Sequence, residues 1–221
     1  MKKVVLIGST GHIGSVILRE LINRGHQVTA IARHADKIPF KADKLKVVET
    51  DIEDKTSIID TCKGADAVIS AYNPGWTNPN IYEDTLKNYS AILDAVKESG
   101  VNRLLIVGGA GTLFVKPGVT VIDSGFIPEE ILPAVKGLAE FFLHTLKKEK
   151  DIDWVFFSPA GTFLDNGIRT GKFRLGKDDL IVDEKGNSSI SVEDYAVAMV
   201  DEIENRRFVG KRFTAVSERN A

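Results

Sequence analysis

The chain has 221 residues, which suits one domain with a complete hydrophobic core. Its net charge of −2 lacks the basic excess of nucleic-acid-binding proteins, so we expect no nucleic-acid partner. The one cysteine, Cys62, excludes a disulfide framework within the chain and argues against a cysteine metal site.

Apolar runs alternate with helical stretches through the first half of the sequence. The predicted strands are 2–7, 27–32, 45–48, 67–71 and 103–107. Apolar residues recur at helical spacing from Ile13 until the stop signal Arg24-Gly25, and further helices are predicted at 56–62 and 82–99. Unbroken apolar runs are typical of strands buried on both faces. This order predicts a parallel sheet with right-handed crossovers.

The second half of the sequence is less regular. We expect a loop with little regular structure at 114–126, a helix at 133–150 and a strand at 154–157. Residues 159–190 are rich in turn signals and predict a small hairpin lobe for the substrate. Ser191, with Asp194 three residues later, predicts the start of a helix that extends to about residue 206, before a strand at 211–216. The prediction is one α/β domain over 1–221, a Rossmann-type doubly wound parallel sheet with a small C-terminal hairpin/helix substrate lobe.

The sequence GSTGHIG at residues 8–14 joins the first predicted strand to the first predicted helix. In Rossmann folds one glycine makes the turn, one lets a pyrophosphate approach the helix N-terminus, and one lets helix and strand pack closely. Gly8, Gly11 and Gly14 fit this pattern with one extra residue in the first gap. The lysine of a P-loop is missing. The loop therefore predicts dinucleotide binding, the alternative being a tight turn without a ligand.

The end of the second predicted strand indicates which dinucleotide binds. NAD sites place an acid there for the ribose 2′-hydroxyl, whereas NADP sites accommodate the 2′-phosphate with an arginine. No acid lies between Gln27 and Ala35, and Arg33 can meet a phosphate through two parallel hydrogen bonds. We predict that NADPH is preferred over NADH, unless Arg33 is only a solvated loop residue. Asp51 and Ile52, after the third strand, are expected to contact adenine.

The strand order and several motifs resemble the short-chain dehydrogenase/reductase superfamily, in particular its atypical members; these motifs are GSTGHIG, TAIAR and TDIED. Other segments resemble bacterial NAD(P)H-binding proteins described provisionally as NADH-flavin reductases, a group similar to biliverdin-IXβ reductase and to NmrA-like proteins; these segments include LLIVGGAGTLFV, DWVFFSPAG and KRFTA. The resemblance covers essentially the whole chain. It implies the fold and the cofactor much more firmly than the reaction, because a fold does not fix a function.

The resemblance also implies a set of cofactor contacts. For the pyrophosphate it implies Gly8, Thr10, Gly11, His12, Ile13 and Gly14. It implies a 2′-phosphate site at Arg33 and an adenine site at Asp51 and Ile52. On the nicotinamide side it implies Ser70, Ala71, Tyr72, Gly108, Gly109, Pro159, Ala160 and Gly161.

The catalytic pair of the classical superfamily is missing. Those enzymes use a tyrosine and a lysine four residues later, which lowers the tyrosine pKa so that it can pass a proton. None of the four tyrosines has this lysine, and Lys136, after the fifth strand, has Leu132 in the tyrosine position. Lys136 is expected to bind the nicotinamide ribose, unless it is only a surface lysine. Tyr72 and Lys136 are the candidate catalytic residues.

Two functions remain open. A flavin accepts hydride at a ring nitrogen and a proton from water, so reduction needs mainly the stacking of two rings. Tyr72 and Trp76 predict an aromatic platform for this, with Phe114, Phe126 and Phe163 as walls. The first hypothesis is therefore an NAD(P)H-dependent reductase of a flavin, such as FMN, or another planar acceptor. The alternative is an NADP(H)-binding redox sensor of the NmrA kind; an epimerase is disfavoured because it needs the Tyr-Lys pair.

The expected partner is a small planar molecule, and a homodimer stays open. The histidines are not spaced as metal ligands, so no metal site is expected. The start of the chain lacks the pattern of a secretory leader, and no apolar run approaches the roughly 20 residues that span a bilayer. We expect a cytoplasmic location with no membrane partner.

Overall fold

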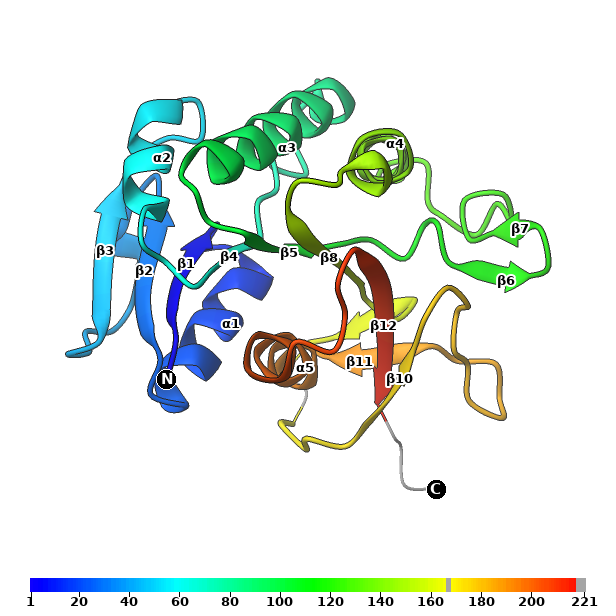
Figure 1. Ribbon diagram of the computed structural model, residues 1–221. Helices are drawn as coiled ribbons and strands as arrows, with labels where there is room; N and C mark the ends of the chain where they lie inside the picture. The colour runs from blue at the N-terminus through cyan, green and yellow to red at the C-terminus, as the bar shows by residue number, and fades with distance from the viewer. Residues whose placement is uncertain (166–167, 218–221) are drawn as a thin grey trace.

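The computed structural model describes residues 1–165 and 168–217, and its centre is an eight-stranded sheet (Figure 1). The strands of this sheet are β1 (Lys3–Ile7), β2 (Gln27–Ala32), β3 (Leu45–Glu49), β4 (Ala67–Ser70), β5 (Arg103–Val107), β8 (Asp153–Ser158), β10 (Phe173–Gly176) and β12 (Lys211–Ser217). Their order is β10-β12-β8-β5-β4-β1-β2-β3. Every neighbouring pair is parallel except β10 and β12. The predicted doubly wound sheet is confirmed.

The strand sequences explain why the middle of the sheet is buried. All residues of β4 and β8 are buried, and β5 is buried apart from Val107. Unbroken apolar strands of this kind need cover on both faces, which parallel sheets receive from helices. The chain runs outward from β1 to β2 and β3 and then returns to β4 on the other side of β1. The loops after β1 and β4 therefore diverge and open a crevice at the carboxyl edge of the sheet.

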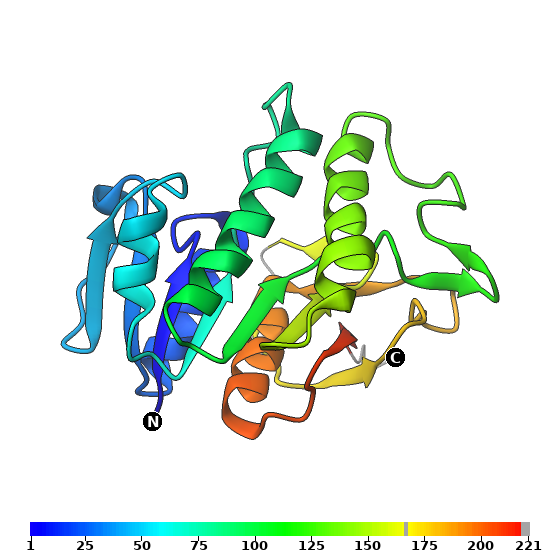
Figure 2. The ribbon, with the colours of Figure 1, turned by 45° about the horizontal axis from the view of Figure 1, so that its top comes forward.

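Two layers of helices cover the sheet. Helices α1 (His12–Asn23) and α5 (Val192–Asn205) lie below it in Figure 1, whereas α2 (Lys55–Cys62), α3 (Ile81–Glu98) and α4 (Leu132–Glu140) lie above it. Figure 2 shows α3 and α4 side by side. Leu21 of α1 and Met199 of α5 share the core of the lower layer, while Ile58 of α2 and Ile92 of α3 share the upper one. In the described part of the chain, no helix is both long and apolar enough to cross a bilayer.

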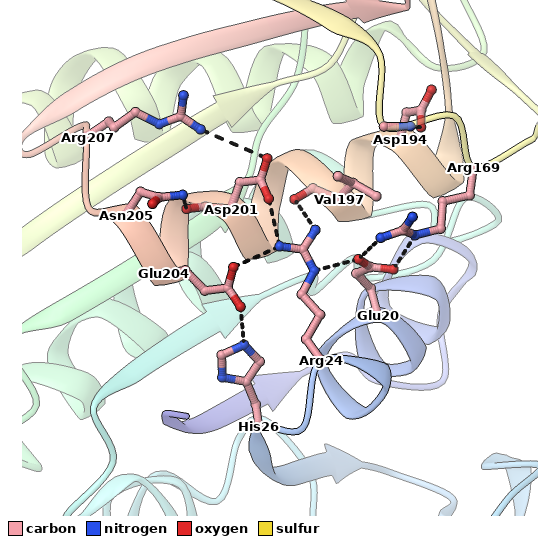
Figure 3. Close-up of polar contacts among 11 residues, drawn as sticks. Glu20, Arg24, His26, Arg169, Asp194, Val197, Asp201, Glu204, Asn205 and Arg207 are labelled. Atoms are coloured by element: carbon pink, nitrogen blue, oxygen red, sulfur yellow. Dashed lines mark hydrogen bonds and ion pairs between the residues drawn. The ribbon is translucent and has the colours of Figure 1, made fainter.

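An ion-pair network joins α1 to α5 (Figure 3). Arg24, directly after α1, donates to Glu20 at 2.6 Å, to Asp201 at 2.7 Å and to Glu204 at 2.9 Å. Glu20 is only 5% exposed and also accepts two hydrogen bonds from Arg169, at 2.7 and 2.8 Å. The network therefore connects α1, α5 and the segment that leads into β10.

Residues 114–126 contain more regular structure than the sequence-based expectation of a loop. β6 (Phe114–Lys116) and β7 (Val119–Thr120) form a small antiparallel hairpin. The turn between them is Pro117-Gly118, and Gly118 has a φ of 77°, which glycine adopts without strain. A short 3₁₀ turn, η1 (Ala35–Lys37), follows β2.

The predicted helix at 133–150 changes its winding along its length. After α4 the chain continues as a π-helical turn, η2 (Phe141–Thr145), and a 3₁₀ turn, η3 (Leu146–Lys148). Phe141 and Phe142 are buried at this change, and Phe142 stacks on Phe156 of β8 with ring centroids 4.3 Å apart. This packing accompanies the change of winding, which the apolar spacing of the sequence does not encode.

The segment 159–190 does not form the single hairpin that its turn signals suggested. β9 (Thr162–Leu164) pairs in parallel with β11 (Ser189–Ser191), while β10 joins the central sheet beside β12. The two ends of the segment therefore pair with each other, while its middle is attached to the central sheet. Ser191 accepts a hydrogen bond of 3.0 Å from the Asp194 N–H, so the predicted start of α5 is confirmed.

Candidate functional site

A cleft of about 880 Å³ opens at the carboxyl ends of β1, β4, β5 and β8, the edge at which open parallel sheets bind ligands. Its walls come from the glycine loop, from the segments after β4, β5 and β8, from the β6–β7 hairpin with the chain that follows it, from α4, and from residues 186–189. Within residues 1–165 and 168–217, no group of three or more His, Cys, Asp or Glu side chains is arranged to hold a metal ion.

Two of the three loop glycines are required by the fold itself. Gly8 has a φ of 79°, and a Cβ on it would lie 2.5 Å from the carbonyl oxygen of Ala71. A Cβ on Gly14 would lie 2.1 Å from the carbonyl oxygen of Gly8. Both distances are far below contact, so these glycines allow β1, α1 and the end of β4 to pack closely.

Gly11 has no comparable requirement from its neighbours. Its φ is −72°, and a Cβ on it would meet only the Gly8 carbonyl oxygen, at 3.3 Å. Gly11 is exposed and lines the cleft. It directly precedes α1, whose start has neither a side-chain cap nor an acidic residue in its first turn. An anion can therefore reach the free N–H groups there, which fits the pyrophosphate of a dinucleotide.

Side chains of the same loop hold it in place. Ser9 is buried, and its hydroxyl donates to the Ile31 carbonyl oxygen at 3.0 Å, which ties the loop to the end of β2. Nε2 of His12 lies 2.8 Å from Oδ1 of Asp165, which directly follows β9. Sequence reasoning gave neither contact, because each joins residues that lie far apart in the chain.

The adenosine end of the predicted site lies at the ends of β2 and β3. Arg33 is exposed and forms no hydrogen bond or ion pair with the described residues. The Asp51 carboxylate accepts from the Glu53 N–H at 3.0 Å, and Ile52 packs against the upper core. Sequence reasoning missed Glu49, whose carboxylate accepts from the Ala35 N–H at 2.8 Å beside this site.

Tyr72 reaches the cleft from the segment after β4 and is held by α3. Its hydroxyl accepts from Nδ2 of Asn88 at 2.6 Å, and its carbonyl oxygen accepts from the Tyr89 hydroxyl at 2.7 Å. The two tyrosine rings meet edge to face, with centroids 5.8 Å apart. Burial raises the pKa of the Tyr72 phenol above its ordinary value, and the Asn88 hydrogen bond opposes this only in part. Tyr72 is therefore a fixed, protonated wall of the cleft.

The segments after β5 and β8 form the nicotinamide side of the predicted site. A Cβ on Gly108 would lie 2.5 Å from the Phe156 ring, so packing already requires glycine there. At Gly109 the nearest atom is Cδ2 of Leu138 at 3.3 Å, which leaves more room for a ligand to approach the backbone. Pro159 and Ala160 also line the cleft.

The structure brings together most, but not all, of the predicted site residues. Those lining the cleft are Gly11, His12, Ile13, Ala71, Tyr72, Gly108, Gly109, Pro159, Ala160 and Gly161. Gly8, Thr10 and Gly14 belong to the same loop without lining the cleft, and Ser70 is fully buried at the end of β4. Lys136 is exposed on α4 and is not part of the lining.

The aromatic walls differ from the prediction at one position. Trp76, Phe126 and Phe163 line the cleft as expected, whereas Phe114 does not. The backbone of Phe114 instead bonds to Asp178 and Leu180, at 2.8 and 2.9 Å. Sequence reasoning missed the apolar wall of α4; Ile131, Ala134, Val135 and Leu138 form it at helical spacing.

Comparisons with known proteins agree with this geometry. The family model for NAD(P)H-binding proteins matches residues 8–206. YwnB of Bacillus subtilis is 38% identical over 218 residues, which are 98% of this chain and 99% of that protein. Among solved structures, a provisionally assigned epimerase from Bacteroides thetaiotaomicron is 54% identical with a TM-score of 0.93, and covers 100% of this chain and 99% of its own.

A second solved structure is a provisionally assigned NADH-flavin reductase from Streptococcus pneumoniae. It is 31% identical with a TM-score of 0.86, and the match covers 99% of this chain and all of the other. The names of these two structures differ in reaction, but both proteins share the fold over their whole length. The glycine cradle, the cleft at the carboxyl edge and the family match lead to one conclusion: the chain belongs to the NAD(P)H-binding family of Rossmann-fold proteins.

Proposed function

We propose that the protein is an NADPH-dependent reductase of a flat, conjugated acceptor such as a flavin. One observation carries the proposal: a single cleft joins the glycine cradle to walls made of aromatic and aliphatic side chains. The cradle fits a dinucleotide, and the walls fit a ring system that stacks rather than a sugar, which needs many hydrogen bonds.

Arg33 and the N-terminus of α1 account for the cofactor side of the proposal. Arg33, exposed and without a carboxylate partner among the described residues, is available for a 2′-phosphate. Glu49 is the nearby acid, and its carboxylate is already engaged by the Ala35 N–H. This arrangement supports a preference for NADPH over NADH. The cofactor would supply a hydride, and the protein would exclude water and align the rings.

The acceptor side supports reduction by stacking. Tyr72 is fixed by Asn88 and Tyr89, and Trp76, which is 63% exposed, lines the same cleft. None of the four tyrosines has a lysine four residues later, so a proton relay of the classical kind is missing. A flavin does not need one, because hydride reaches a ring nitrogen and water supplies the remaining proton. We also propose that this reductase is cytoplasmic.

The decisive experiment follows NADPH oxidation by absorbance with riboflavin, FMN, biliverdin and quinones, while NADPH and NADH affinities are measured by titration. We expect NADPH to bind more tightly than NADH and at least one flat acceptor to be reduced. The Gly11→Ala variant serves as the cofactor-binding control. If NADPH binds tightly and no acceptor is reduced, the protein is a redox sensor and the reductase proposal is wrong.

A further inference from the structure

The part of the cleft beyond the glycine loop is lined by apolar side chains from four segments. Val115 belongs to β6, Phe126 to the chain after β7, Ile131 and Leu138 to the start and the body of α4, with Ile131 as its N-cap, and Phe163 to β9. We call this part of the cleft the acceptor arm. Val115 is 38% exposed and Phe126 is 83% exposed, so both stand at its mouth. An apolar arm of this kind favours a ligand that loses little hydration on entry.

The charge of the lining is the informative feature of the cleft. Of the described residues that line it, none is Lys, Arg, Asp or Glu, and His12 is already paired with Asp165. The other polar side chains of the lining are neutral, among them those of Asn73, Thr162, Asn187 and Ser188. Neutral groups of this kind can hydrogen-bond a carbonyl or hydroxyl, but they cannot neutralise a phosphate or carboxylate.

Basic residues on the elements that form the arm do not compensate. Lys116 of β6 and Lys136 of α4 are exposed and lie outside the lining, as does Lys185 beside the 186–189 segment. Arg33 is at the opposite, adenosine end of the predicted site. An anionic acceptor would therefore lose hydration in the arm without gaining a cationic partner.

Charges of both signs flank the mouth in the chain: Lys116 directly follows Val115, whereas the charged residues around Phe126 and before Ile131 are acidic. Asp123 lies between Val121 and Phe126, and hydrogen bonds from Thr120 lower the pKa of its carboxyl, which keeps it ionised. Glu129 and Glu130 come directly before Ile131, the residue at the start of α4. Carboxylates that directly precede a helix N-terminus disfavour the approach of an anion to it.

We infer that the acceptor arm selects uncharged flat acceptors and discriminates against those that carry phosphate or carboxylate groups. The inference rests on the proposed function and narrows it: the ring of riboflavin or of a simple quinone fits the arm, whereas the phosphate of FMN does not. The discrimination comes from the missing positive charge in the lining, together with the carboxylates of Glu129 and Glu130 that precede α4.

The test uses pairs of probes that share a ring and differ in charge. Riboflavin and FMN are titrated into the protein loaded with NADP⁺, which permits binding without turnover, and flavin fluorescence reports the affinity. Menadione and a naphthoquinone sulfonate are compared in the same way by calorimetry. We expect the uncharged member of each pair to bind at least about tenfold more tightly, because an unpaired charge is costly in an apolar site.

A matched pair of variants tests the cause. Val115→Lys places a positive charge at the mouth, and Val115→Gln places a neutral polar group of similar length there. We expect Val115→Lys to raise the affinity for FMN relative to riboflavin about tenfold, since a charge-assisted contact is now available. Val115→Gln is expected to keep the wild-type ratio of the two affinities.

Each outcome decides the matter. The inference is supported if the uncharged probes bind more tightly and if only Val115→Lys shifts this preference toward FMN. It is supported even if NADPH is never oxidised, because missing NADPH oxidation would overturn only the proposed reductase function. Equal or tighter binding of the charged probes overturns the inference, and so does a failure of every uncharged probe to bind. In those two cases, NADPH oxidation with other acceptors reports separately on the reductase function.

Discussion

The glycines of the 8–14 loop differ in what surrounds them, so substitutions at Gly14 and Gly11 can distinguish a role in folding from a role in cofactor binding. Gly14 is in contact with the backbone of Gly8, whereas the open side of Gly11 faces the cleft. We expect Gly14→Ala to lower the melting temperature strongly or to prevent folding, because its Cβ would lie 2.1 Å from a carbonyl oxygen. Gly11→Ala should fold normally and bind NADPH about tenfold or more weakly, since the added methyl group occupies the approach of the pyrophosphate.

Thermal unfolding and NADPH titration of the two variants check this prediction. A folded Gly11→Ala protein with unchanged NADPH affinity would contradict the assignment of the pyrophosphate site. A Gly14→Ala protein with wild-type stability would contradict the packing argument.

Arg33 is predicted to read the 2′-phosphate. We expect Arg33→Glu to weaken NADPH binding by roughly tenfold or more and largely to spare NADH, because hydrogen bonds between charged groups contribute about 1.5–3 kcal/mol each. Lys37→Glu, in the neighbouring turn η1, makes the same change of charge and serves as the control. Equal losses for both cofactors in Arg33→Glu would show that Arg33 does not distinguish them.

The Tyr72 hydroxyl is bonded to Asn88 and has a raised pKa, so it is a poor proton carrier. Tyr72→Phe should therefore keep most of the turnover with a flat acceptor and lose about 1 kcal/mol of stability, because Asn88 loses its acceptor. Tyr72→Ala should raise the KM for the acceptor. Tyr82→Phe, outside the cleft lining, is the control. Abolished turnover in Tyr72→Phe would mean that the hydroxyl passes a proton.

At the scale of elements, the contact between α1 and α5 depends on Glu20. Arg169 and Arg24 hold the pKa of the Glu20 carboxyl below its ordinary value of 4.5, with the Arg169 hydrogen bonds as the largest cause. A depressed pKa means that Glu20 stabilises the fold fully above pH 4.5 and loses this effect as the pH falls through the folded-state pKa. We expect Glu20→Gln to lower the free energy of unfolding by about 1–3 kcal/mol at pH 7.

Urea unfolding at a series of pH values tests this expectation. The difference between wild type and Glu20→Gln should shrink as the pH falls below 4.5. Asp60→Asn removes an exposed partner of Lys63 on α2 and is expected to change stability by less than about 0.5 kcal/mol. A difference for Glu20→Gln that does not depend on pH would refute the ionic origin of the effect.

The elements that could be predicted from the sequence are those whose signal is local. The buried strands and the glycine loop follow from apolar runs and from glycine spacing. The β6–β7 hairpin was expected to be a loop, because its strands of three and two residues are too short to show a pattern. The change of winding at Phe141 could not be predicted from the sequence, because it accompanies the packing of Phe142 on Phe156. Glu20 and Arg169 are 149 residues apart in sequence, so no local spacing could pair them.

At the scale of the whole molecule, the candidate site is assembled from distant parts of the chain. The loops after β1, β4 and β5 were predictable, since parallel strands place their carboxyl ends at one edge. The wall formed by α4 and the β6–β7 hairpin could not be predicted, because no local sequence pattern determines the angle at which these elements leave the sheet. Lys136 is an example of what sequence position alone does not determine. Its place after β5 suggested a contact with the nicotinamide ribose, but its side chain is exposed on α4 and is not part of the cleft lining.

The same assembly predicts how the molecule unfolds. β10 is hydrogen-bonded to β12, Phe163 meets Tyr195 edge to face, and Arg169 is bonded to Glu20, so the 159–190 segment is joined to both the sheet and α1. We therefore expect a single cooperative thermal transition. NADPH at 100 times its dissociation constant should stabilise the fold by about 2.7 kcal/mol. For a chain of this length this raises the melting temperature by about 5–10 °C.

Scanning calorimetry with and without NADPH measures both quantities, and Gly11→Ala should show the single transition with a much smaller shift. Two transitions, with only one raised by NADPH, would mean that the 159–190 segment is an independent unit. The cleft walls that this segment supplies, among them Phe163 and Ser188, would then move independently of the glycine cradle. A single transition that NADPH raises would instead indicate that one core holds both the acceptor arm and the glycine cradle. Stacking of two rings at a fixed distance needs such a common core.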